Sequence, residues 1–289
     1  MTAPIISAEL LDVRRRKAEV LVLDATVELA PAKHDGDHTS STGLAGWERE
    51  HIPGSRHADL LHLLSDPAAP FHFAVPSPSA LVAALSSLGV RDGVPVVTYD
   101  RNGGLWAARL WYLLDWLGVE ASVLDGGFAA WQSAGLPVSA GPAGAPVDAG
   151  PLTVRERDGR WVGKEDLAAW MAGEKDATVV CALNPEAYAG EVPTRYSRRG
   201  HIPGSGNLPA RSLTGADGLF LPAEELRAAL GGLAEDPAPV WVYCGGGISA
   251  TVVALALAAV GRGDVAIYDG SLEEWSADPS LPLELGRGG

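Results

Sequence analysis

The residue best suited to chemistry in this sequence is a cysteine in a glycine-rich turn. Cys244 follows an apolar segment at 239–243 and precedes another at 250–260. The residues between are Gly245, Gly246, Gly247, Ile248 and Ser249. Successive glycines let backbone N–H groups turn inward as an anion-binding nest, and a helix that begins there adds partial positive charge. Both effects favour thiolate over thiol, so we expect Cys244 to be a nucleophile and this turn to bind its substrate.

Two thiolate chemistries use a turn of this kind. Phosphatases carry an arginine six positions after the cysteine, where its planar guanidinium binds the phosphoryl group. This sequence has Ala250 at that position and no arginine between Cys244 and Val260. The alternative is sulfur transfer, in which the thiolate takes a sulfane sulfur, holds it as a persulfide and passes it to an acceptor. The missing arginine favours sulfur transfer over phosphoryl transfer.

The turn belongs to an internal duplication. HIPGS occurs at 51–55 and 201–205, DGGFAAW at 125–131 is echoed by DGSLEEW at 269–275, and PVVTYD at 95–100 is echoed by PVWVYC at 239–244. The separations are 150, 144 and 144 residues, which is the size of a domain. We therefore expect two tandem domains at residues 1–140 and 153–289. The segment at 138–152 is rich in Gly, Pro and Ala and is expected to be the linker.

Short apolar strands alternate with helices in each copy. The strands expected in the first copy span 20–25, 94–99 and 121–124, and the helices span 79–88, 106–117 and 128–134. The second copy repeats this order with strands at 177–182, 239–243 and 265–268 and helices at 222–233, 249–261 and 272–277. The pattern predicts an α/β fold, in which each domain is a parallel sheet with helices on both faces. Ligands of such sheets bind at the carboxyl ends of the strands, where Cys244 stands.

The first copy has Asp100 at the position of the cysteine, followed by RNGGLW. A carboxylate cannot perform thiol chemistry. We therefore expect one catalytic copy and one inactive copy, which supports the fold and helps to wall the active site.

Taken together, these features resemble the tandem-domain rhodanese family, which includes thiosulfate and 3-mercaptopyruvate sulfurtransferases. The resemblance rests on HIPGS in both copies, the DGG and DGS motifs each followed by tryptophan, and a cysteine only in the second copy. It covers nearly the whole chain. It implies two rhodanese domains, with the active site of the second facing the domain interface. It also implies a sulfurtransferase with Cys244 as sulfur carrier and thiosulfate as donor, with 3-mercaptopyruvate as the alternative donor and a thiol, cyanide or thioredoxin-like protein as acceptor.

The chain departs from this family at two places. The cysteine loop lacks the basic residues usual in the thiosulfate type and is nearer the mercaptopyruvate type, but Gly246 replaces the serine usual there. Leu183 stands where an arginine commonly binds the substrate carboxylate. Arg195, Arg198 and Arg199 are candidates to bind the anion instead, and a solvated basic turn is the alternative interpretation. The same departures keep open a non-catalytic rhodanese-like binding module.

Three further residues have two interpretations each. His51 and His201 occur in both copies, which favours a structural histidine that bonds to the backbone of its turn. The resemblance also places His51 near the substrate. Cys181 ends a predicted strand of the same sheet as Cys244 and is either a second thiol that attacks the persulfide or a small core residue.

Composition limits the other functions. The chain of 289 residues has 36 acidic and 22 basic side chains and a net charge of −14, which argues against binding nucleic acid or anionic membranes. Two cysteines suit a reducing compartment, no export signal is evident, and the longest apolar run is too short to cross a bilayer. We expect a cytoplasmic monomer without metal or cofactor. His34 and His38 are four residues apart but lie in a polar segment that we expect to be mobile rather than metal-bound.

Overall fold

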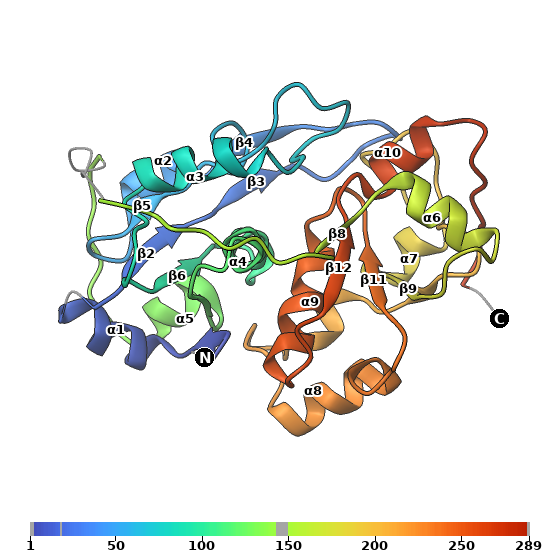
Figure 1. Cartoon of the computed structure of the whole chain (residues 1–289). Coiled ribbons are helices and arrows are strands. Elements are labelled where there is room, and N and C mark those ends of the chain that lie inside the picture. The colour runs from blue at the N-terminus through green and yellow to red at the C-terminus, as the bar shows by residue number, and fades with distance from the viewer. Residues whose placement is uncertain (1–2, 18, 143–149, 288–289) are drawn as a thin grey trace.

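Each half of the chain forms its own five-stranded parallel sheet in the computed structural model, which describes residues 3–17, 19–142 and 150–287. The first sheet has the order β1 (Ile5–Ile6), β7 (Ala121–Leu124), β6 (Val96–Tyr99), β2 (Leu21–Asp24), β5 (Arg56–His57). The second has the order β8 (Trp161–Val162), β12 (Val265–Tyr268), β11 (Val240–Tyr243), β9 (Thr178–Cys181), β10 (Gly206–Asn207). The two orders correspond strand for strand, so the duplication seen in the sequence is a duplication of the fold (Figure 1). Outside the sheets, β3 (Val27–Leu29) pairs with β4 (Ser40–Thr42) in an antiparallel ribbon.

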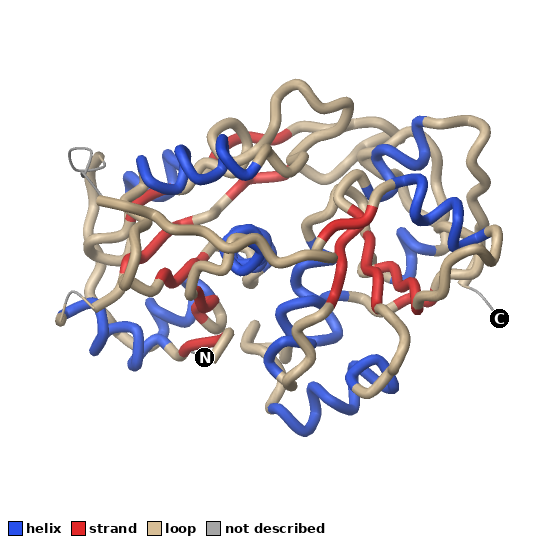
Figure 2. Tube along the Cα trace, in the orientation of Figure 1, coloured by secondary structure: helices blue, strands red, loops and turns tan. Residues whose placement is uncertain are grey.

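Helices cover both faces of each sheet (Figure 2). Side chains of a strand alternate between the two faces, and here both faces carry apolar side chains that the helices bury. On the first sheet, α1 (Ala8–Arg16) and α5 (Gly127–Ser133) cover one face, and α3 (Pro78–Ser87) and α4 (Leu105–Trp116) the other. On the second sheet, α6 (Lys164–Met171), α7 (Pro185–Tyr188) and α10 (Ser271–Ala277) cover one face. The other face packs against α8 (Ala223–Leu230), α9 (Ser249–Ala259) and the 3₁₀ turn η1 (Ala210–Leu213). The remaining elements are α2 (Leu44–Arg49) and η2 (Gly231–Ala234).

The two halves share part of their core. Helices α4 and α9 pack against each other between the sheets, and Trp111 and Tyr112 of α4 belong to the apolar cluster of the second sheet. In return, Ile248 from the cysteine turn belongs to the apolar cluster of the first sheet. The turn that precedes α9 is therefore held by both copies, so the first copy contributes to the shape of the site.

The predicted fold class is confirmed, and the predicted central strands and helices lie within two residues of the observed ones, except that the helix predicted over 222–233 is divided into α8 and η2. The four two-residue strands at the sheet edges were not predicted, nor were α1, α2, α6 and α7. Part of the predicted linker, 143–149, lies outside the described residues. Beyond it, Thr153 bonds to Asp92 through N–H···Oδ1 at 2.7 Å, and Arg157 N donates to the carbonyl of Trp116 at 2.8 Å. The chain thus follows the first domain before it enters β8. None of the described helices is long and apolar enough to cross a membrane.

Candidate active site

Cys244 lies at the carboxyl end of β11, between the strand and the first turn of α9. Parallel α/β sheets bind their ligands at this edge. Its side chain is 2 % exposed and belongs to the cluster that contains α9. Helix α9 has no side-chain hydrogen bond at its N-cap, so the N–H groups of Ser249 and Ala250 are available to an anion, whereas that of Thr251 donates to the carbonyl of Ile248.

The second DGS motif shapes the cysteine turn. The hydroxyl of Ser271 accepts N–H bonds from Cys244 and Gly247, both at 3.0 Å, and donates to the carbonyl of Tyr268 at 2.7 Å. Ser271 adopts φ +48°, a left-handed conformation that is costly for a non-glycine residue. At the equivalent position the first copy has Gly127, with φ +57°. The second copy therefore has a hydroxyl that orders the cysteine turn, and the first copy has none at this position. The DGG and DGS motifs show this difference, but not what the serine does.

A buried arginine of the first copy supports the turn from the other side. Arg109 of α4 is 1 % exposed. Its guanidinium donates to the carbonyl of Gly247 at 3.3 Å and to that of Phe73 at 2.7 Å, and pairs with Asp269 at 2.7 Å. Sequence reasoning missed Arg109, although a single charge in the apolar run LWAARLWYLL was a signal. It is a positioning residue that joins the two copies beneath the site.

The first copy shows what this kind of nest holds. The carboxylate of Asp100 accepts four backbone N–H bonds of 2.7–2.9 Å, from Asn102, Gly104, Trp106 and Ala107. Burial raises the pKa of Asp100, and these backbone bonds act in the opposite direction. The side chain fills its own nest, which leaves no room there for a substrate. The first copy is thus closed by an internal anion.

Of the four corresponding donors in the second copy, Thr251 N–H donates to the carbonyl of Ile248 at 3.0 Å, and the other three are open. Counted from the cysteine, the open donors are the N–H groups of Gly246, Ile248 and Ala250, and the structure gives none of these three a protein acceptor. The sign of φ differs between the two turns at one position, since Gly104 has φ +85° and Ile248 has φ −94°. A thiolate or persulfide at Cys244 can therefore receive N–H donors that Asp100 consumes in the first copy.

Cys181 lies on the opposite face of the second sheet from Cys244. It is in register with Tyr243, the residue before the cysteine, and strand side chains alternate between faces. Burial raises the pKa of its thiol to about 12. Of the two interpretations of Cys181, this position supports the core residue over the second reactive thiol.

The three candidate arginines bond to other parts of the protein rather than to the cysteine turn. Arg195 donates to the carbonyl of Ala30 at 2.7 Å, and Arg199 pairs with Asp35 at 2.9 Å, so both join the second copy to the first. Arg198 bonds to carbonyls of the C-terminal segment, those of Trp275, Ser276, Asp278 and Leu281. Each guanidinium thus has a structural partner.

Tyr196, within the same segment, lies closer to the cysteine turn. A Cβ added to Gly245 would stand 3.5 Å from its ring, and its buried hydroxyl has no hydrogen-bond partner. Tyr196 was not predicted, because a single uncharged side chain among arginines shows no motif.

The HIPGS histidines hold their own turns. His51 Nδ1 bonds to the carbonyl of Trp47 at 2.8 Å and its ring stacks on that of Trp47, while His201 does the same with Tyr188. Both histidines are buried. These contacts support the structural interpretation, and those of His51 all lie within the first copy.

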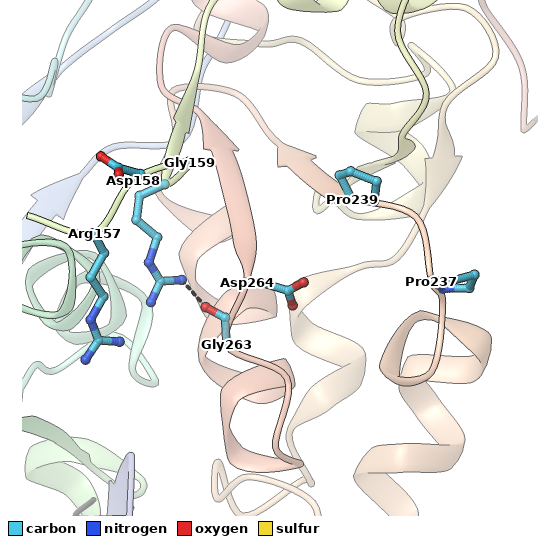
Figure 3. A pocket seen from close by; sticks show the side chains of 8 residues that line it. Arg157, Asp158, Gly159, Pro237, Pro239, Gly263 and Asp264 are labelled. Atoms are coloured by element: carbon cyan, nitrogen blue, oxygen red, sulfur yellow. Dashed lines mark hydrogen bonds between the residues drawn. The ribbon is translucent and has the colours of Figure 1, made fainter.

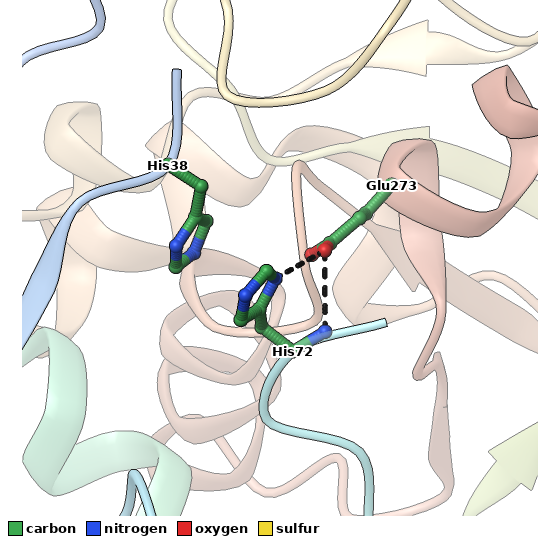
Figure 4. A group of neighbouring side chains, drawn as sticks. All are labelled: His38, His72 and Glu273. Carbon is green, nitrogen blue, oxygen red and sulfur yellow. Dashed lines mark hydrogen bonds and ion pairs between the residues drawn. The ribbon is translucent and has the colours of Figure 1, made fainter. Parts of the chain in front are cut away.

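A cluster of His38, His72 and Glu273 was not foreseen (Figure 4). Glu273 N–H donates to the carbonyl of Gly245 at 2.8 Å, so the cluster adjoins the cysteine turn. Burial, and then the charge of His72, lower the pKa of His38. The segment of His38, expected to be mobile, is thus packed against a distant part of the chain.

A surface hollow lies at the other end of the second sheet (Figure 3). Its lining residues precede strands β8, β11 and β12 and include Gly159, Pro239 and Asp264. Since Cys244 lies at the carboxyl end of β11, this hollow is remote from the thiol and has no part in its chemistry.

Because its hydroxyl accepts N–H bonds from Cys244 and Gly247, Ser271 should control the reactivity of Cys244. In Ser271→Ala the buried N–H groups of Cys244 and Gly247 lose their acceptor while the left-handed φ remains, so we expect a loss of about 2–3 kcal/mol in stability and roughly 10-fold in sulfur loading. Ser271→Gly relieves the backbone strain and should be the more stable of the two, with the same loss of loading. Chemical denaturation and single-turnover loading measure both. Wild-type loading in either variant would contradict this assignment.

These features define a class of protein: two copies of one parallel α/β domain, with a thiol-bearing anion nest in the second copy and a filled nest in the first. The Rhodanese family, described as a rhodanese-like domain, matches residues 6–134 and 165–278. The chain belongs to this family. The predicted recognition is confirmed, and the two matched ranges fall one in each copy.

The relatives agree on the type of reaction. The 3-mercaptopyruvate sulfurtransferase of Escherichia coli is 32% identical, over 92% of this chain and 92% of that protein. SseB of Mycobacterium tuberculosis, provisionally assigned as a thiosulfate sulfurtransferase, is 36% identical over 92% of this chain and 97% of its own. The crystal structure of SseA from E. coli superposes with a TM-score of 0.78 at 29% identity and covers 93% of this chain and 99% of SseA. The predicted enzyme class, a sulfurtransferase, is confirmed.

Proposed function

We propose that the protein transfers sulfane sulfur through a persulfide on Cys244, with thiosulfate as donor. The observation that carries this proposal is the pair of nests. In the first copy four N–H groups bind a carboxylate, and in the second three of the equivalent donors follow a cysteine at the carboxyl end of a strand and have no protein acceptor. A persulfide anion fits the open nest, because it places negative charge where Asp100 places its own.

The reaction has two displacement steps. The Cys244 thiolate attacks the outer sulfur of thiosulfate, a new S–S bond forms, and sulfite leaves with the electron pair of the broken bond. An acceptor thiolate or cyanide then attacks the terminal sulfur of the persulfide, and Cys244 leaves as thiolate. The backbone donors and the N-terminus of α9 stabilise the anion at each stage. No oxidant or reductant is consumed.

The choice of donor is the finer part of the proposal. With 3-mercaptopyruvate the same attack would release pyruvate, and a cation would be needed for its carboxylate. Leu183 provides none, and Arg195 and Arg199 already bind Ala30 and Asp35. Thiosulfate is an anion too, but it needs no separate carboxylate site and the backbone donors of the turn can receive it, so it stays our first donor and 3-mercaptopyruvate the alternative. We further propose a thiol or a thioredoxin-like protein as acceptor, a monomer as the working state and the cytoplasm as its location.

Intact-protein mass spectrometry tests the proposal. After incubation with thiosulfate, we expect a gain of one sulfur, about 32 Da, that an added thiol acceptor removes. A parallel incubation with 3-mercaptopyruvate compares the donors, and faster loading by it would reverse our choice of donor. If neither donor loads a folded protein with a free Cys244 thiol, the enzyme proposal is wrong and the non-catalytic binding module takes its place.

A further inference from the structure

Two histidines of the first copy and one glutamate of the second meet beside the cysteine turn. His38 lies between β3 and β4, His72 lies in the segment before α3, and Glu273 lies in the first turn of α10. One side-chain nitrogen or oxygen atom from each of the three lies within 4.8 Å of the others (Figure 4). We propose that these three residues form a binding site for a divalent transition-metal ion of the zinc type, which would bridge the two copies.

The donor set suits such an ion. Two imidazoles and one carboxylate are typical ligands of zinc and of other divalent transition metals, and they leave at least one coordination position open. Bonds of about 2.1 Å at tetrahedral angles place ligand atoms about 3.4 Å apart. The present separations of up to 4.8 Å require only small side-chain movements, and His72 and Glu273 are partly exposed, at 48% and 19%.

The contact between His72 and Glu273 alone does not account for the cluster. His72 already bonds to Glu273 through its ring Nδ1, and its backbone N–H donates to the same carboxylate oxygen at 3.2 Å. His38 adds nothing to that contact, yet its ring stacks on His72 with centroids 3.7 Å apart and planes 4° apart. A metal site needs a third ligand at this place, whereas a contact between two residues does not.

Binding requires one local rearrangement. The nitrogen lone pairs of two parallel rings lie in parallel planes, so one ring must turn before both can point at a common ion. Rotation of a histidine ring about its last side-chain bond has a broad, shallow profile. The ion would take the place of the proton between His72 and Glu273, and the neutral ring would carry its proton on Nε2 instead. Arg195 is a neighbouring positive charge that acts against the cation, and the carboxylate of Glu273 offsets it.

The site would also contact the catalytic turn. Glu273 donates its backbone N–H to Gly245, and a Cβ placed on Gly246 would stand 3.4 Å from its carboxylate. An ion held by Glu273 would therefore link the first copy to the residues that follow Cys244. The inference concerns binding and does not depend on the proposed sulfur transfer.

The test is metal binding by the full-length chain after treatment with a chelator. Co²⁺ is titrated and followed by its visible absorption, and Zn²⁺ is titrated by calorimetry. We expect one ion per chain, and an affinity at least about 10-fold weaker in His38→Ala, His72→Ala and Glu273→Gln. Since these side chains are partly exposed, the variants should fold, and their thermal unfolding confirms this.

Two further variants make the result specific. His62 is a matched control, because it pairs with Asp59 at 2.9 Å, is 70% exposed and lies outside the cluster; His62→Ala should bind as wild type does. Cys244→Ser should also keep the ion and its spectrum. The proposal is overturned by the absence of one-to-one binding, by wild-type affinity in the His38 and His72 variants, or by binding that disappears in Cys244→Ser, which would assign the ion to the thiol.

Discussion

Cys244→Ser should reduce sulfur transfer to background, a loss of at least about 10³-fold, while the fold is kept. A serine hydroxyl is not ionised at neutral pH and cannot hold a sulfane sulfur as a persulfide. The change is small, and the backbone bonds of the turn to Ser271 do not involve the thiol. Steady-state transfer from thiosulfate to cyanide measures the loss, and circular dichroism checks the fold.

The second cysteine provides the control. Cys181→Ala removes the thiol on the opposite face of the sheet, and it should lower stability by opening a small cavity while transfer per folded molecule remains near wild type. Because burial raises the pKa of Cys181 to about 12, it carries negligible thiolate at neutral pH. If Cys181→Ala, rather than Cys244→Ser, abolished sulfur loading, the nucleophile would be wrongly assigned.

A candidate nucleophile could be predicted because its signal is local. Cys244, its glycines, the preceding strand and the following helix are contiguous, so the chain itself specifies the carboxyl end of a parallel strand and a helix N-terminus. The duplication added a direct comparison, since Asp100 marked the copy without the thiol. The central strands were predictable for the same reason, being apolar runs bounded by turns.

The residues that hold the turn could not be predicted in this way. Ser271 and Arg109 act on it from 24 and 138 residues away, and only the packed sheet and the α4–α9 contact bring them there. The arginines of 195–199 were favoured because of their charge, but whether a charge faces a substrate or a carbonyl depends on tertiary packing. The edge strands were missed because two residues are too few to show a period.

The same limit applies to His38, His72 and Glu273. No two of them share a segment, and a search for ligands by spacing paired His38 with His34 instead. Such a cluster is a property of the interface between the copies. The duplication therefore explains the catalytic framework, whereas Arg109 and this cluster act where the two copies meet.

Gly247→Ala should cost about 100-fold in sulfur loading, while Gly246→Ala, one residue earlier, should cost little. Gly247 has φ +71°, and a Cβ there would stand 2.7 Å from the carbonyl oxygen of Asp269. That oxygen is backbone at the start of the DGS turn and cannot yield, so the cysteine turn must move. A displacement of about 1 Å in a catalytic group is enough for a loss of this size.

Gly246 differs in both respects that matter. Its φ is outside the left-handed region, and a Cβ would lie 3.4 Å from the carboxylate of Glu273, the mobile end of a side chain. Single-turnover loading followed by mass spectrometry compares the two variants, and thermal unfolding shows whether Gly247→Ala is also the less stable. Equal loading would mean that the turn is free to adapt and that its N–H groups do not hold the reacting sulfur in a fixed position. A selective loss at Gly247 would instead show that catalysis depends on a rigid nest. In the first copy the carboxylate of Asp100 occupies the equivalent nest in place of a substrate.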